Sequence, residues 1–164
     1  MRATLLVFCL ILFTHGYTQV NPDKAYQSVL NQAKVGKEYS FDKSKKGYYD
    51  SLVVVYLGTI KTNKGRVIKF LTSRWYWGHF PRATSRIVVF NEKNQYLGDY
   101  YLTMDYDVPD KIEGKSLVFI NDKNSDCTPG FITRVSFRYG IPKQFFLQCK
   151  DNMGDIYSFE QNLY

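Results

Sequence analysis

The stretch LVVVYLGTIKTNKGRVIKFLTSRWYW, residues 52–77, decides the fold class. Its two halves, 52–62 and 66–77, are rich in β-branched and aromatic residues, which favour extended strands. Asn63-Lys64-Gly65 lies between the halves and is a turn sequence. The stretch therefore predicts a β-hairpin.

The same pattern of strands and turns continues to the C-terminus. A second hairpin is expected from residues 85–91 and 95–104, and further strands from 115–121 and 155–160. Residues 131–138 and 143–149 flank Tyr139-Gly140-Ile141-Pro142 and are expected to form a third hairpin. About eight regularly spaced strands with no alternating helices predict an all-β fold, an antiparallel sandwich or barrel.

The N-terminus carries an export pattern. Arg2 precedes nine apolar residues, 5–13, and the small residues Gly16 and Thr18 follow, so residues 1–18 are predicted to be a cleavable signal peptide. The apolar run is too short for a transmembrane helix, which needs about 20 residues. A secreted or periplasmic protein without a transmembrane segment in its mature chain is therefore expected.

The segment after the signal begins with a helix signal. Asn21 suits the N-cap and Pro22 the first helical turn, so one short helix is predicted over about 22–34. Residues 19–47 are interpreted as this helix and a charged linker, and residues 48–164 as the β-rich domain. A disordered tail remains the alternative for the helix.

The net charge of the chain limits the classes of partner that it is expected to bind. The chain has a net charge of +7, and loss of Arg2 with the signal leaves +6, which favours anionic partners such as acidic glycans or simply maintains solubility. Export disfavours nucleic acid as a partner.

Cys127 and Cys149 are the two cysteines left after cleavage, and they predict one disulfide, placed across the open end of the third hairpin.

The most distinctive motif is RWYWGHFPRATSR, residues 74–86. On a strand, Trp75, Trp77 and His79 share one face and Arg74 the other. Two indoles on one face can stack on sugar rings or anchor a protein partner, but the pattern is more typical of residues that fill a core. The candidate ligand-binding residues are Arg74, Trp75, Trp77, His79 and Arg82.

A second aromatic stretch, residues 95–104, also alternates. Regular pleating puts Tyr96 and Tyr100 on one face and Asp99 and Tyr101 on the other. Neither face is cleanly polar. The stretch is expected to be a strand covered on both sides, with an exposed aromatic surface as the alternative.

Catalytic patterns are few. His79 is the one histidine left after cleavage, and no nucleophile elbow, phosphate loop or zinc motif accompanies it, so neither a metal nor a cofactor is expected. The aspartates Asp99, Asp105, Asp107 and Asp110 are the candidates for a carboxylate pair.

Three functions follow from these features. The preferred one is a small exported, non-catalytic binding protein for a glycan or a protein partner. A carboxylate-dependent glycan hydrolase and a structural component of an envelope assembly are the alternatives.

Overall fold

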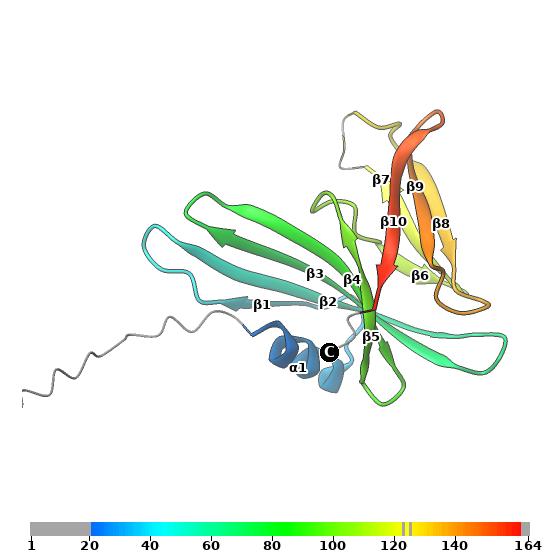
Figure 1. The fold of residues 1–164 in the computed structure, drawn as a ribbon, viewed down its shortest axis with the longest axis horizontal. Coiled ribbons are helices and arrows are strands. Elements are labelled where there is room, and N and C mark those ends of the chain that lie inside the picture. The colour runs from blue at the N-terminus through cyan, green and yellow to red at the C-terminus, as the bar shows by residue number, and fades with distance from the viewer. Residues whose placement is uncertain (1–20, 123, 125, 162–164) are drawn as a thin grey trace, which may run out of the picture.

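A computed structural model of the chain describes residues 21–161 apart from 123 and 125, so the predicted signal peptide lies outside the described residues. This part of the chain forms one helix and ten antiparallel strands (Figure 1). The elements are α1 (Pro22–Gln32), β1 (Glu38–Asp42), β2 (Tyr49–Lys61), β3 (Val67–Gly78), β4 (Arg82–Asn91), β5 (Tyr96–Leu102), β6 (Lys111–Glu113), β7 (Ser116–Asn121), β8 (Phe131–Ser136), β9 (Gln144–Lys150) and β10 (Met153–Glu160). The predicted all-β, sandwich-like fold is confirmed.

The strands form two sheets. The larger has the order β1-β2-β3-β4-β5-β10-β9, and the smaller has the order β6-β7-β8. The predicted hairpins β2–β3 and β4–β5 are confirmed and form the centre of the large sheet. The two strands beyond the expected eight are β1, which lies in the predicted linker, and β6, which contains three residues in a predicted loop. No helix among the described residues is long and apolar enough to cross a membrane.

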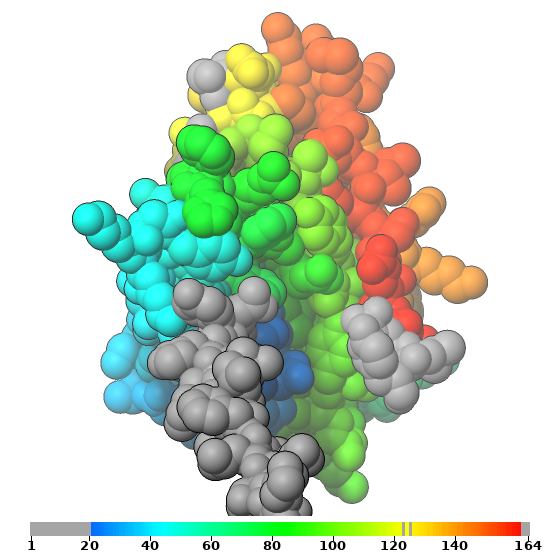
Figure 2. Space-filling model, turned by 60° about the vertical axis from the view of Figure 1, so that its left-hand side comes forward, coloured from blue at the N-terminus to red at the C-terminus, as the bar shows by residue number. Residues whose placement is uncertain are grey.

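Helix α1 covers part of one face of the large sheet. The Asn21 side chain accepts a hydrogen bond from the Lys24 amide, and the left-handed Ala33 ends the helix just before the predicted residue 34. In Figure 2 the blue atoms of α1 lie between cyan atoms of the first strands and green atoms of later ones. One core cluster lies under the helix: Ala25, Tyr26, Val29 and Leu30 meet Leu52, Val54, Tyr56, Leu71, Val88 and Phe90.

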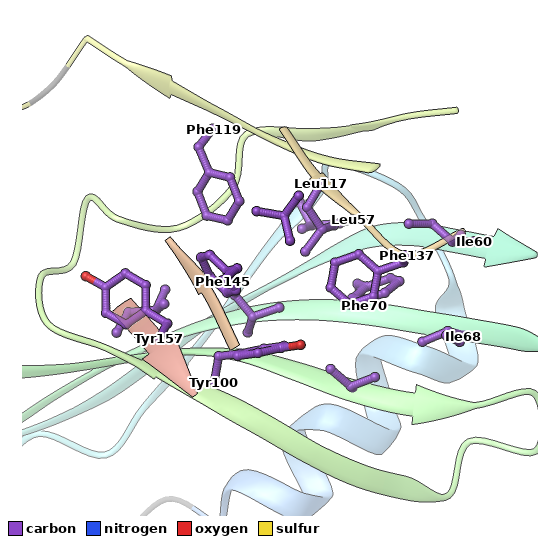
Figure 3. Close-up of a cluster of buried hydrophobic side chains, with 14 residues drawn as sticks. Leu57, Ile60, Ile68, Phe70, Tyr100, Leu117, Phe119, Phe137, Phe145 and Tyr157 are labelled. Carbon is purple, nitrogen blue, oxygen red and sulfur yellow. The ribbon is translucent and has the colours of Figure 1, made fainter. Parts of the chain in front are cut away.

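The opposite face carries the larger core (Figure 3). Phe137 of the β8–β9 connection packs edge-on against Phe70 at a centroid distance of 4.7 Å, and Phe145 of β9 lies 5.0 Å from Tyr100 of β5. The buried Tyr100 hydroxyl donates to the Pro142 carbonyl over 2.6 Å. Strands β7 to β10 therefore form the second layer of the sandwich.

The close approach of β10 to β5 requires a glycine. β10 pairs with β5 only through Phe159 and Glu160, so most of β10 is free to pass over the sheet with β9. A Cβ atom at Gly98 would collide with the Glu160 carbonyl and the Phe159 ring, and Gly98 has φ +145°. This backbone conformation favours glycine.

The predicted hairpin of residues 131–138 and 143–149 is wrong. β8 pairs with β7 in the small sheet, whereas β9 pairs with β10 in the large one. The predicted disulfide nevertheless forms: Cys127 and Cys149 are bonded, with their Cα atoms 4.6 Å apart. The bond therefore joins the loop after β7 to β9, and with it the two sheets, rather than closing a hairpin.

Removal of this bond is expected to destabilise the fold. The double substitution C127A/C149A frees a segment whose ends are 22 residues apart, so the free energy of unfolding should fall by about 3 kcal/mol, measured by urea denaturation. Reductant should lower the stability of the wild type and leave the variant unchanged. A wild type whose denaturation midpoint ignores reductant would contradict this prediction.

Candidate functional site

A groove of about 760 Å³ lies on the helix-bearing face of the large sheet, beside the start of α1. We call it the aromatic groove because half of its lining residues are aromatic: Tyr26, Tyr48, Trp75, Trp77, Phe90, Tyr96 and Tyr101. Its size is within the range of about 300–1,000 Å³ typical of ligand sites. The groove occupies the part of this face that the helix leaves open.

Strand register brings the two tryptophans and their partners together. Trp75 and Trp77 lie on the same face of β3, and each donates its indole N–H to a neighbouring strand. Trp75 Nε1 bonds Asp50 Oδ1 of β2 at 2.9 Å, and Trp77 Nε1 bonds Thr84 Oγ1 of β4 at 3.1 Å. With both N–H groups satisfied within the protein, the rings are held in place.

A charged pair lies at the floor of the groove. Asp99 of β5 is only 4% exposed, and its carboxylate accepts hydrogen bonds from Arg86 Nη1 at 2.6 Å and from the Tyr96 hydroxyl at 2.5 Å. Burial, followed by the hydrogen bond to Asp99 and its charge, raises the pKa of Tyr96, so this hydroxyl remains a donor. The Arg86 guanidinium also lies 5.1 Å from the centre of the Tyr101 ring.

Three of the five candidate ligand-binding residues lie in or beside the groove. Trp75 is half-buried against the cluster beneath α1, whereas Trp77 is 37% exposed. Neither tryptophan is a fully buried core residue. The guanidinium of Arg82 lies 5.6 Å from the centre of the Trp77 ring, at a distance that suits a cation–π contact.

The other two candidates have different roles. His79 Nδ1 lies 2.7 Å from the Gly47 carbonyl, so it carries a proton and donates, and its ring packs edge-on against Tyr48 at 5.4 Å. It joins the β1–β2 and β3–β4 turns, which lie side by side as cyan and green atoms in Figure 2. Arg74 faces away from the groove and pairs with Glu38 at 2.9 Å.

Sequence reasoning missed the groove residues contributed by β4 and β5. It placed Tyr96 and Asp99 on opposite faces of one strand, but they are hydrogen-bonded to each other. The reason is a β-bulge: Val89 pairs with Gly98 and Phe90 with Tyr96, which leaves Leu97 as the extra residue. The glycine within YLGDYY is the signal that could have indicated the bulge.

The four candidate aspartates do not share one site. Asp99 bonds Arg86 in the groove, Asp105 accepts from the Tyr76 hydroxyl, Asp107 from the Tyr157 hydroxyl and Asp110 from the Ile120 amide. Asp50, on the groove side of β2, is separated from Asp99 by two strands and by a register offset of six residues, Arg82 to Val88 on β4, so their backbones lie more than about 14 Å apart. Glycosidase carboxylates are about 5–9.5 Å apart. This separation excludes Asp50 and Asp99 as a glycosidase pair, whereas Asp105 is close enough to Asp107 for its charge to help raise the pKa of Asp107, and the hydrolase alternative stays a hypothesis for that pair.

The described residues, 21–161 apart from 123 and 125, contain no candidate metal site. No group of three or more histidine, cysteine, aspartate or glutamate side chains is close enough there to hold a metal ion.

Comparisons with known protein families, curated proteins and solved structures found no match to this chain. The function of the chain is therefore inferred from the geometry of the aromatic groove.

Loss of Arg86 is expected to leave the Asp99 carboxylate buried without its cation. Arg86→Leu should lower the free energy of unfolding by about 2–3 kcal/mol, because an unpaired buried charge is costly. The double substitution R86L/D99N should recover most of that loss. Urea denaturation at neutral pH measures both variants, and independent, additive losses would contradict the coupling.

Ionisation of the half-buried Asp107 carboxyl is expected to lower the stability of the fold as the pH rises. Burial, with smaller effects from Asp155 and Asp105, raises the pKa of Asp107, so folding favours the protonated form. Stability from this group therefore falls as pH rises from the unfolded pKa through the raised folded one. Asp107→Asn should be more stable than the wild type at neutral pH and lose this advantage in acid, as measured by denaturation across pH. A variant less stable than the wild type at neutral pH would show that the charge is stabilising.

Proposed function

We propose that this protein is an exported binding protein whose aromatic groove holds a neutral carbohydrate. The observation that carries the proposal is the combination of fixed aromatic rings with a polar floor on one concave surface. Ligand sites are commonly lined by aromatic side chains with a few placed polar groups. A sugar ring matches both features, since it has an apolar C–H face and a rim of hydroxyls.

Exposure of the rings supports this choice. Trp77 is 37% exposed and Tyr101 is 47% exposed, and both line the groove. Trp77 is held by its bond to Thr84, and Tyr101 lies under the Arg86 guanidinium. Rings that are already held in place lose little conformational freedom when a ligand stacks on them.

The charges of the groove favour a neutral ligand. Arg86 and Asp99 form a 2.6 Å ion pair, and one carboxylate oxygen of Asp50 accepts from Trp75. With Asp23, which also lines the groove, three aspartates and one arginine give the lining a net formal charge of −2, so the groove repels anions. Oriented polar groups of this kind suit hydroxyls, which both donate and accept.

Export rests on two independent features. Residues 1–18 have the pattern of a signal peptide, and Cys127 is bonded to Cys149. Structural disulfides persist in oxidising compartments such as the periplasm or the cell exterior. Both features support a protein that meets its ligand outside the cytoplasm.

Truncation of the exposed rings is expected to weaken carbohydrate binding. Trp77→Ala and Tyr101→Ala should each reduce affinity about tenfold or more, because aromatic anchors dominate such sites. Calorimetric titration with cellohexaose, maltohexaose and chitohexaose measures the effect. Phe146→Ala is the matched control, because Phe146 is an exposed aromatic residue that does not line the groove.

The same titration also shows which results would contradict carbohydrate binding in the groove. The proposal fails if the wild type binds none of these oligosaccharides, or if the Phe146 control loses as much affinity as the groove variants. Trp77→Phe keeps an aromatic face and should retain most of the binding. Thermal unfolding of each variant separates lost stacking from lost structure.

A further inference from the structure

A second hollow, of about 1080 Å³, lies over the turns at the start of β3 and the end of β4. It is formed by the β2–β3 turn, the β4–β5 turn, the β8–β9 connection and the end of β10. Its apolar residues Ile68 and Leu97 belong to the larger core, on the side of the sheet away from α1. This hollow is therefore separate from the aromatic groove.

Positive charge dominates its lining. Lys64, Arg66, Lys93 and Lys143 line the hollow, and Glu92 is the one acidic residue among the described lining residues. We call it the basic cleft. Its local formal charge of +3 compares with +7 for the whole chain. Clefts lined by one sign of charge concentrate ligands of the opposite sign.

These cations are not balanced by carboxylates in the described part of the chain. Within residues 21–161 outside the two gaps, none of the four basic side chains forms an ion pair. By contrast, Arg74 and Arg86 each pair with a carboxylate. The charge of the cleft is therefore available to an outside ligand.

The framework of the cleft is fixed by backbone hydrogen bonds. The Asn63 amide donates to the Arg138 carbonyl at 2.8 Å, and the Phe159 amide donates to the Lys143 carbonyl at 2.8 Å. In addition, the Arg66 guanidinium lies against Gly140, where a Cβ would be 3.4 Å from Nη2. Turns that are distant in sequence are thereby tied into one cationic surface.

An aromatic ring adds a stacking surface to this charge. Tyr139 lines the cleft and is 71% exposed, and the Arg138 guanidinium lies 5.8 Å from its ring centre. Ile141 and Phe159 provide apolar lining nearby. The cleft thus combines dispersed positive charge with an exposed ring.

We propose that the basic cleft is a second binding site, for an acidic carbohydrate chain bearing carboxylates or sulfates. Three lysines and one arginine provide dispersed point charges, and Tyr139 can stack on a sugar ring. The cleft is recessed, which disfavours a flat membrane surface. The walls of the cleft are turns whose backbone amides, such as those of Asn63 and Gly65, already donate hydrogen bonds within the protein. These amides therefore cannot pair with a bound peptide as a strand edge would.

Charge reversal tests the proposal. Three labelled polysaccharides serve as probes: polygalacturonate carries carboxylates, heparin adds sulfates, and dextran is the neutral reference. Fluorescence anisotropy measures the affinity of each probe for the full mature chain. K64E/R66E changes the β2–β3 turn and K93E/K143E changes the β4–β5 turn and the β8–β9 connection, and each should weaken binding of the acidic probes about tenfold or more. Binding should also weaken as salt is added.

The control changes the same net charge elsewhere. Lys34 and Lys150 are exposed and do not line the cleft, so K34E/K150E should leave affinity within about twofold of the wild type. Tyr139→Ala should weaken binding without changing the salt dependence, which a purely electrostatic attraction would not predict. Relative affinity for polygalacturonate and heparin distinguishes a carboxylate from a sulfate ligand.

Several results would overturn the proposal. These are equal loss in the K34E/K150E control, binding of neutral dextran to Trp77→Ala as tight as that of the acidic probes, or tighter binding of poly-glutamate or of phosphatidylglycerol vesicles than of both acidic glycans. Trp77→Ala should bind the acidic probes as well as the wild type does. Failure of the cleft is therefore distinguishable from failure of the aromatic groove. Thermal unfolding of both reversal variants confirms that they are folded.

Discussion

The structure depends on covering both faces of the β2–β5 meander. One face is covered by strands β7 to β10, whereas α1 is the one described element that covers the other, and its 11 residues span about 16 Å. Strand β2 has 13 residues, or about 43 Å. The helix therefore leaves part of its face open, and Trp75, Trp77 and Tyr101 occupy that part. The aromatic groove is a geometric consequence of pairing a short helix with long strands.

Local periodicity was sufficient to predict most strands, but not how they associate. The two central hairpins were predictable because their turns connect neighbouring residues. Residues 131–138 and 143–149 read as another hairpin, yet they separate because Phe137 enters the core between them and each strand pairs elsewhere. Pairing between distant segments depends on packing, which a single sequence does not display.

The candidate site was predictable to the same extent. Trp75 and Trp77 share one strand, so alternation alone places them on one face. The residues that complete the groove come from β4 and β5, and their placement depends on register and on the bulge at Leu97. A one-residue change of register moves side chains to the opposite face. That is why Tyr96 and Asp99 were separated in the prediction but are hydrogen-bonded in the fold.

The two hollows differ in how their charges are balanced. In the groove, Arg86 is neutralised by Asp99, and Asp23 and Asp50 leave a net formal charge of −2, so the lining repels anions and the aromatic rings remain for a ligand. In the basic cleft, four cations face a single lining carboxylate, Glu92, so charge itself is the dominant feature. Because the cleft's core residues lie on the face away from α1, occupation of one hollow leaves the other open. A chain with both sites, as proposed, would hold a neutral and an acidic carbohydrate together, and their joint retention would exceed that of either site alone if the two were parts of one polymer network.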